Sequence, residues 1–343
     1  MSNREPGREF PWGCRVIARK DGKDINWKRL LKKVFICLLA LFILLSLIPY
    51  LIPPQQLSGN RRELAYPNSN FSEAGEIELH YRHWGDNGGE ERNILLVHGL
   101  GASTFSWRYT APYLEAAGYR VIAVDLPGFG LSERKKGLDH SADARAELLW
   151  LLLDSLDPGS KWHLVGHSMG GATVTAMALQ QPDRANSLTL AAGALAVFEP
   201  SVRNTLLKYP PLGRWFKVLG TRFLLNEKRV EMLLSSAYGR QPSAEEIQGY
   251  YLPLKLEKTD AVLVDLINTA PVPLLDRVGA LTLPVLCIWG EDDTWIPLER
   301  GRELVSLIEG AELVVLPAEG HCPMETSPDL FNRELLLFLE GLK

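Results

Sequence analysis

The stretch that decides the fold is Trp162-His163-Leu164-Val165-Gly166-His167-Ser168-Met169-Gly170-Gly171. Its apolar pair Leu164-Val165 predicts a buried strand, and the sequence from Ala172 onward (ATVTAMALQQ) predicts a helix. A serine at so sharp a turn adopts a strained backbone, and Gly166 and Gly170 remove the Cβ atoms that would otherwise collide. We therefore expect the Ser168 hydroxyl to stand out of the sheet, beside the unpaired Met169 amide at a helix N-terminus.

Short apolar runs and helical patterns alternate along most of the remaining chain. The expected strands are 76–85, 93–97, 120–125, 164–165, 187–191, 285–289 and 312–316, and the expected helices are 105–118, 142–156, 169–181, 298–309 and 328–341. This alternation predicts an α/β fold with a mostly parallel, doubly wound sheet that is covered on both faces. Between Gly193 and Thr282 the sequence is helical and contains prolines and aromatic residues. We expect a helical cap there, over about 198–278, inserted above the serine turn.

A serine hydroxyl is a weak nucleophile and needs a base, itself oriented by a third group. Of the seven histidines, His321 follows the last expected strand, in the kind of strand-end loop where open α/β sheets build their sites. We expect it to be the base. The acid should follow the preceding strand, where Glu291, Asp292 and Asp293 occur; we expect Asp293, with Asp292 as the alternative. Other histidines are expected to be structural (His163 and His167) or to lie in the first, outer strand (His80 and His83).

A second glycine-containing loop directly follows the expected strand 93–97. Its sequence is His98-Gly99-Leu100-Gly101, and its glycines let the backbone approach a substrate. The amides of Leu100 and Met169 are therefore expected to bind one oxyanion together. Losing one such donor typically costs about 2.7–4 kcal/mol of transition-state stabilisation. The residues expected to support this loop and the serine turn are His98, Gly99, Gly166 and Gly170.

Composition and charge exclude some classes of function. The chain has 343 residues, is 46% hydrophobic and carries a formal net charge of -4. Residues 1–33 carry +6, whereas 53–343 carry -10 and contain no basic stripe, so we expect no nucleic-acid partner. The four cysteines have no paired spacing. A disulfide framework or a zinc site is therefore not expected, and nothing predicts another metal or an organic cofactor.

Residues 34–52 contain no charged residue, and these 19 residues are close to the roughly 20 that cross a bilayer as a helix. Lys28, Arg29, Lys32 and Lys33 precede them, which predicts a cytoplasmic N-terminus and an extracytoplasmic catalytic part. We expect a basic cytoplasmic tail (1–33), a transmembrane helix (34–52), a linker (53–74) and one domain (75–343). The alternatives are a cleavable signal peptide, a buried core helix, or a monotopic anchor that leaves the catalytic part in the cytosol.

With these residues assembled, the chain from about 75 to 343 resembles the α/β-hydrolase fold family. The likeness is closer to its capped branch of esterases, monoacylglycerol lipases, carbon–carbon bond hydrolases and haloperoxidase-like members. The motifs that carry it are HGLG (98–101), DLPGFGLS (125–132), GHSMGG (166–171), WGEDDTWIP (289–297) and EGHCP (319–323). The resemblance implies Asp293 as the acid and the Leu100 and Met169 amides as the oxyanion hole. Ser168 at the turn, where haloalkane dehalogenases and epoxide hydrolases carry aspartate, argues against both of those chemistries.

The sequence thus predicts a membrane-anchored serine hydrolase that cleaves small-molecule carboxylic esters, lipophilic ones in particular, through an acyl-enzyme on Ser168. A carbon–carbon bond hydrolase or an amidase would use the same three residues. A different class of protein also remains open, namely a membrane-tethered relative that binds a ligand without turnover.

Overall fold

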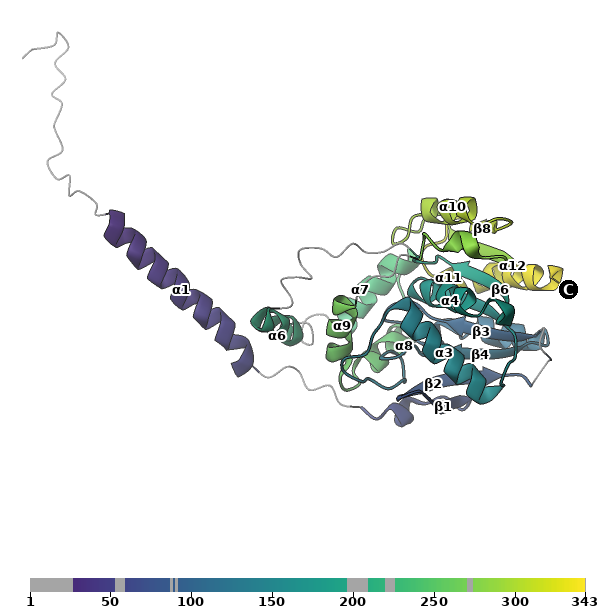
Figure 1. Ribbon diagram of the computed structural model, residues 1–343, viewed down its shortest axis with the longest axis horizontal. Coiled ribbons are helices and arrows are strands. Elements are labelled where there is room, and N and C mark those ends of the chain that lie inside the picture. Colours follow the sequence, from purple (N-terminus) through teal and green to yellow (C-terminus); the bar gives the residue numbers. More distant parts are fainter. Residues whose placement is uncertain are drawn as a thin grey trace, which may run out of the picture. The chain divides into compact units, whose positions relative to one another are not determined.

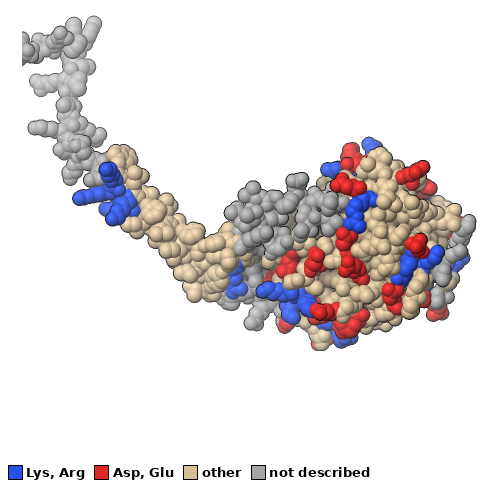
Figure 2. Space-filling model, viewed as in Figure 1, with Lys and Arg blue, Asp and Glu red and all other residues tan. Residues whose placement is uncertain are grey.

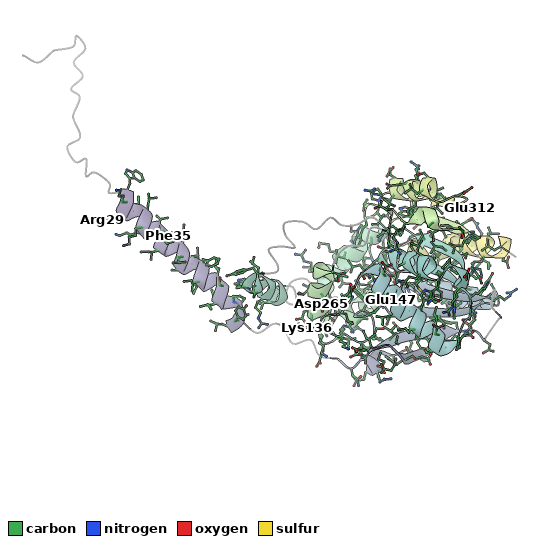
Figure 3. All side chains as sticks on the ribbon, viewed as in Figure 1. Arg29, Phe35, Lys136, Glu147, Asp265 and Glu312 are labelled. Atoms are coloured by element: carbon green, nitrogen blue, oxygen red, sulfur yellow. The ribbon has the colours of Figure 1, made fainter. Side chains whose placement is uncertain are left out.

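The computed structural model describes residues 27–52, 59–86, 89, 92–195, 209–219, 226–269 and 274–342. It divides into two units, Met1–Ile48 and Pro49–Lys343. The helix α1 (Trp27–Leu51) is long and apolar enough, by length and composition, to cross a membrane. Figure 2 shows basic side chains at its N-terminal end, followed by a stretch without charge. Its side chains, Arg29 and Phe35 among them, project outward, and Phe35 is 65% exposed (Figure 3).

An eight-stranded sheet, in the order β1-β2-β4-β3-β5-β6-β7-β8, forms the centre of the second unit (Figure 1). The strands are β1 (Ser69–Ala74), β2 (Ile77–Trp84), β3 (Asn93–Val97), β4 (Arg120–Val124), β5 (Trp162–His167), β6 (Ala185–Ala191), β7 (Val285–Gly290) and β8 (Glu312–Leu316). β1 and β2 pair antiparallel, β2 pairs antiparallel with β4, and the remaining pairs are parallel. The predicted mostly parallel sheet is confirmed.

The order of the strands fixes where a site can form. The chain leaves β3 for β4 on one side and then returns to β5 on the other side of β3. Such a reversal opens a crevice at the carboxyl ends of the two strands. Val97 at the end of β3 lies beside Gly166 of β5 in the parallel register. The loop after β3 and the serine turn after β5 therefore emerge next to each other.

Both faces of the sheet are covered. Along β3, Leu95 and Val97 belong to one apolar cluster and Ile94 and Leu96 to the other, as the two-residue period of a strand requires. Helices α3 (Ala142–Leu156), α4 (Met169–Gln180) and α10 (Leu298–Leu307) contribute to the first cluster. Helices α2 (Thr110–Ala116), α11 (Pro323–Thr326) and α12 (Pro328–Gly341) contribute to the second. Each fully buried Leu or Ile side chain contributes about 1.5–3 kcal/mol through burial.

A set of helices is inserted between β6 and β7, as the expected cap requires. The described ones are α6 (Pro210–Leu219), α7 (Glu227–Tyr238), α8 (Ala244–Leu254) and α9 (Thr259–Asn268). Figure 1 shows α7, α8 and α9 grouped at one end of the unit. Asn226 caps the start of α7, Gly239 ends it in the left-handed conformation, and Ser243 with Glu246 forms a capping box at α8. The parts 198–208, 220–225 and 270–273 of the expected cap lie outside the described residues.

The structure differs from two sequence expectations near the start of the domain. The expected linker 53–74 is wrong in its second half, because 61–64 form a short 3₁₀ helix and β1 occupies Ser69–Ala74. The β1 sequence SNFSEA has no apolar alternation, and its strand depends on pairing with β2. For the same reason His80 and His83 are not in an outer strand: both lie in β2, which is the second strand, and His80 is fully buried. The helix expected over 105–118 is divided into a 3₁₀ turn (104–107) and α2.

Candidate active site

Ser168 occupies the turn between β5 and α4 with φ 50° and ψ -119°, a region that non-glycine residues rarely adopt. Its N–H donates to the Ala191 carbonyl (3.0 Å), and its own carbonyl accepts from the amides of Gly171 and Ala194 (2.9 Å each). A Cβ at Gly166 would overlap the Gly170 carbonyl, and one at Gly170 would overlap the backbone at the end of β3. Backbone hydrogen bonds therefore hold the strained residue in place, and both glycines are sterically required.

Asp293 and His321 lie in the loops that follow β7 and β8, and both are buried. Asp293 Oδ2 lies 2.8 Å from His321 Nδ1, while Oδ1 accepts from the amides of Trp295 (2.8 Å) and Ile296 (2.9 Å). Because the carboxylate is acceptor-only, His321 Nδ1 carries the proton and Nε2 is left as the proton acceptor. Asp292 is exposed, so the carboxylate that contacts His321 is that of Asp293.

His167, the residue before Ser168, connects the serine turn to His321. His167 Nε2 lies 2.9 Å from the His321 carbonyl oxygen, and the two rings are 4.8 Å apart. Burial, and then the neighbouring His321, hold the pKa of His167 well below its usual range, so it is neutral at pH 7. The residue directly before Ser168 in the chain therefore contacts His321. Among the described residues the Ser168 hydroxyl has no hydrogen bond, and such contacts often tighten only when substrate binds.

The loop after β3 contacts the same turn. His98 Nδ1 lies 2.7 Å from the Gly99 carbonyl, and its Nε2 accepts from the Leu126 amide at 3.0 Å. Burial lowers the pKa of His98, so the ring stays neutral and pins this loop to the one after β4. A Cβ at Gly99 would lie 2.8 Å from His167 Nδ1, which shows how closely the loop and the turn approach. Leu100 is 54% exposed and Met169 is the first residue of α4, where an amide has no partner within its helix.

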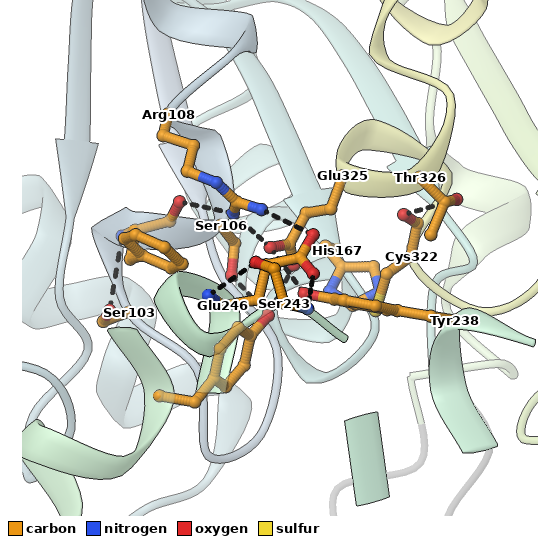
Figure 4. Close-up of polar contacts among 12 residues, drawn as sticks. Ser103, Ser106, Arg108, His167, Tyr238, Ser243, Glu246, Cys322, Glu325 and Thr326 are labelled. Carbon is orange, nitrogen blue, oxygen red and sulfur yellow. Dashed lines mark hydrogen bonds and ion pairs between the residues drawn. The ribbon is translucent and has the colours of Figure 1, made fainter. Parts of the chain in front are cut away.

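A buried polar network that the sequence did not reveal joins the cap to the core (Figure 4). Glu325 of α11 is 2% exposed, pairs with Arg108, and accepts from the hydroxyls of Tyr238 (2.9 Å) and Tyr250. Arg108 also pairs with Glu246 of α8 at 3.3 Å. Burial raises the pKa of Glu325, and the Arg108 guanidinium opposes that rise. These five residues are scattered along the chain without regular spacing, so no sequence signal could have found them.

A second buried pair holds the loop after β4. Asp125 is fully buried, with Oδ2 2.6 Å from His80 Nδ1, and it accepts from the amides of Thr104 and Leu131 at 2.6 Å each. Burial alone would raise the pKa of Asp125, but His80 and the Leu131 amide bring it below its usual value. A Cβ at Gly130 would overlap the carboxylate. The DLPGFGLS motif therefore holds the loop after β4 against the segment after β3 that contains Thr104.

Two buried basic side chains have nitrogen atoms without a hydrogen-bond partner among the described residues. Arg145 of α3 is 4% exposed, and its Nε and one terminal nitrogen have no hydrogen bond. His140 is 2% exposed, and neither ring nitrogen has one. Burial lowers the pKa of Arg145 to about 10. Among all the residues that the structure describes, no three His, Cys, Asp or Glu side chains are grouped so that they could hold a metal ion.

Comparisons with known proteins agree with this architecture. A model of the alpha/beta hydrolase fold family matches residues 92–328. A 2-hydroxy-6-oxononadienedioate/2-hydroxy-6-oxononatrienedioate hydrolase of Burkholderia vietnamiensis is 32% identical over 272 residues, which are 77% of this chain and 91% of that protein. A membrane phospholipase A structure has a TM-score of 0.63 at 21% identity and covers 92% of this chain and 99% of its own. The structure of a thermophilic esterase of Thermogutta terrifontis has a TM-score of 0.64 at 23% identity and covers 80% of this chain and 98% of its own. The likeness to these two structures concerns the fold.

Proposed function

Because this chain belongs to the α/β-hydrolase fold family, we propose that it is a serine hydrolase with Ser168 as nucleophile, His321 as base and Asp293 as the acid that orients His321. The observation that carries the proposal is the buried 2.8 Å contact between His321 and Asp293, beside a serine held in a strained strand-to-helix turn. A nucleophile, a base and an orienting carboxylate in this arrangement are the requirements of acyl transfer.

Each of these groups has a defined step. Ser168 Oγ attacks the substrate carbonyl while His321 Nε2 takes its proton, and Asp293 stabilises the resulting imidazolium. The amides of Leu100 and Met169 donate to the oxyanion of the tetrahedral intermediate. Collapse of the intermediate breaks the ester C–O bond, and His321 returns the proton to the leaving alcohol. Water then attacks the acyl-enzyme with His321 again as base, which releases the carboxylic acid and restores Ser168.

For the substrate we propose a lipophilic carboxylic ester, reached from a membrane. The apolar helix α1 would cross the bilayer once, with its basic end in the cytoplasm and the hydrolase domain on the other side. Protease protection of the domain in sealed vesicles tests this topology.

Carbon–carbon bond hydrolysis is the second candidate. It is favoured by the Burkholderia vietnamiensis relative, whose name states that activity and whose similarity spans most of both chains. Ser168, His321 and Asp293 would serve in it as well, because the attacked group is again a carbonyl.

A substrate panel separates the candidates. The full chain is assayed with p-nitrophenyl esters of increasing acyl length, a monoacylglycerol and a 2-hydroxy-6-oxodienoate, each beside Ser168→Ala. Ester hydrolysis that increases with acyl length and is lost in Ser168→Ala is the expected result. Turnover of the dienoate alone would favour the second candidate. A folded protein that turns over nothing on the panel would favour the ligand-binding relative without catalysis.

A further inference from the structure

The imidazole of His321 lies against two aromatic rings. The indole of Trp295 stacks on it, with ring centroids 5.3 Å apart and an interplanar angle of 23°. The ring of His167 is 4.8 Å away and tilted by 52°. The hydrogen bond to Asp293 holds one edge of the imidazole, but a single hydrogen bond does not by itself fix the tilt of the ring plane. A stacked plane removes this remaining freedom.

Trp295 is itself held from two sides. Its amide donates to Asp293 Oδ1 at 2.8 Å, so the residue belongs to the turn that carries the acid. Its indole Nε1 donates to Ser236 Oγ at 3.1 Å, near the end of the cap helix α7. The side chain nevertheless remains 42% exposed. Burial in the core is therefore a poor explanation for a large aromatic side chain at this position.

The same end of α7 also contacts the histidine loop. The His321 amide donates to the Ala237 carbonyl at 2.8 Å. A Cβ at Gly320 would lie 2.6 Å from that carbonyl oxygen, so the approach requires glycine. Consecutive residues Ser236 and Ala237 thus hold the indole and the backbone of His321 respectively.

We propose that Trp295 is a positioning residue for His321: its indole face holds the imidazole in the plane set by Asp293 and stabilises the imidazolium that forms during reaction. The inference rests on the proposed function of His321 as base. The face of an indole is the best of the aromatic side chains for a cation. Because the cation exists only after His321 takes the serine proton, this interaction is stronger in the transition state than in the ground state. It therefore acts on kcat rather than on KM.

Three variants of the full chain test the role of Trp295 with a p-nitrophenyl ester. Trp295→Leu, which has no aromatic face, is expected to lower kcat about 3- to 30-fold while KM changes less than about twofold. Trp295→Phe keeps an aromatic plane and is expected to recover most of that loss. Ser236→Ala, which removes only the hydrogen bond to the indole, is expected to lower kcat about two- to threefold. The control is Trp84→Leu, a half-buried tryptophan of β2 covered by Arg82.

Thermal unfolding of each variant separates folding from positioning, and if Trp295→Leu does not fold, Ser236→Ala carries the test. An unchanged kcat in folded Trp295→Leu, or in Ser236→Ala where it carries the test, would overturn the proposal. So would a rise in KM without a fall in kcat, which would make the indole a wall of the substrate site. A Phe variant as impaired as the Leu variant would also overturn it. The proposed function fails separately, by lack of wild-type hydrolysis.

Discussion

Asp293 and His321 are 28 residues apart in the chain, yet Asp293 Oδ2 and His321 Nδ1 lie 2.8 Å from each other. Their loops meet because β7 and β8 are adjacent, with Gly290 paired to Leu316. A Cβ at Gly290 would overlap the backbone carbonyls of Glu319 and Gly320, so the glycine is what allows the two loops to touch. The Asp292 amide donates to the Glu319 carbonyl at 2.9 Å, which also ties the two loops together.

This arrangement distinguishes two neighbouring carboxylates. Asp293→Asn is expected to lower kcat for ester hydrolysis about 10⁴-fold, because an amide favours the wrong imidazole tautomer. Asp292→Asn is the matched control, and its kcat is expected to stay within about threefold of wild type, because its side chain is exposed. Steady-state kinetics on one ester measure both. Equal losses in the two variants would show that Asp293 has no special role.

The network at Glu325 is expected to stabilise the fold. Glu325→Gln removes the buried partner of Arg108, and losing one member of a buried pair typically costs about 3–5 kcal/mol. Because Arg108 keeps Glu246 as a second partner, we expect the lower end, about 3 kcal/mol. The control is Glu303→Gln at the exposed Arg300–Glu303 pair, for which we expect less than about 0.5 kcal/mol. Urea unfolding of the full chain in detergent measures both, and similar values for the two would contradict the assignment.

Replacing the buried Arg145, in contrast to Glu325, is not expected to destabilise the fold. Among the residues that the structure describes, two nitrogens of the buried Arg145 guanidinium have no hydrogen-bond partner, which is costly. Arg145→Met is therefore expected to leave the free energy of unfolding unchanged or to raise it by about 1 kcal/mol. Arg134 is the comparison, since it is equally buried but donates to Thr259 Oγ1 and to backbone carbonyls. Arg134→Met is expected to destabilise. Loss of stability in Arg145→Met equal to that in Arg134→Met would mean that Arg145 has a partner after all.

Acid is expected to destabilise the fold through His167. Its pKa is lowered well below 6.5 in the folded chain, so between that value and pH 6.5 only the unfolded chain binds the proton. The contribution of neutral His167 to the free energy of unfolding is complete above about pH 6.5. It is lost as the pH falls, by at most about 1.4 kcal/mol per pH unit. His167→Gln removes the titrating group.

Urea unfolding at pH 7.5 and pH 5.5, for wild type and His167→Gln, measures the effect. The difference in unfolding free energy between the two pH values is expected to be smaller in the variant. Because groups that do not interact with His167 titrate alike in both proteins, their effects cancel in this comparison. An identical pH dependence in the two would show that His167 is protonated equally in both states.

Much of the fold follows from local pattern. The strand 93–97 and the helix 142–156 have the expected bounds, because an uninterrupted apolar run and a helical period are unambiguous at those lengths. β1 could not be predicted, since SNFSEA becomes a strand only by pairing with β2. The sequence did place Ser168, Asp293 and His321 at strand ends, where a parallel sheet brings loops together.

What the sequence could not predict depends on contacts between distant elements. The link between His80 and Asp125, and the group around Glu325, join residues whose spacing has no period. The stacking of Trp295 on His321 likewise depends on how two loops and a cap helix meet. Only the folded chain contains that information.

Reaction of the full chain with a fluorophosphonate probe, with the modified residue identified by mass spectrometry, tests most directly whether Ser168 is a nucleophile activated by His321. A single label on Ser168 is expected, absent in Ser168→Ala and formed much more slowly in His321→Gln. A folded wild-type protein that is not labelled at Ser168, or that is labelled equally fast without His321, would contradict this role of Ser168.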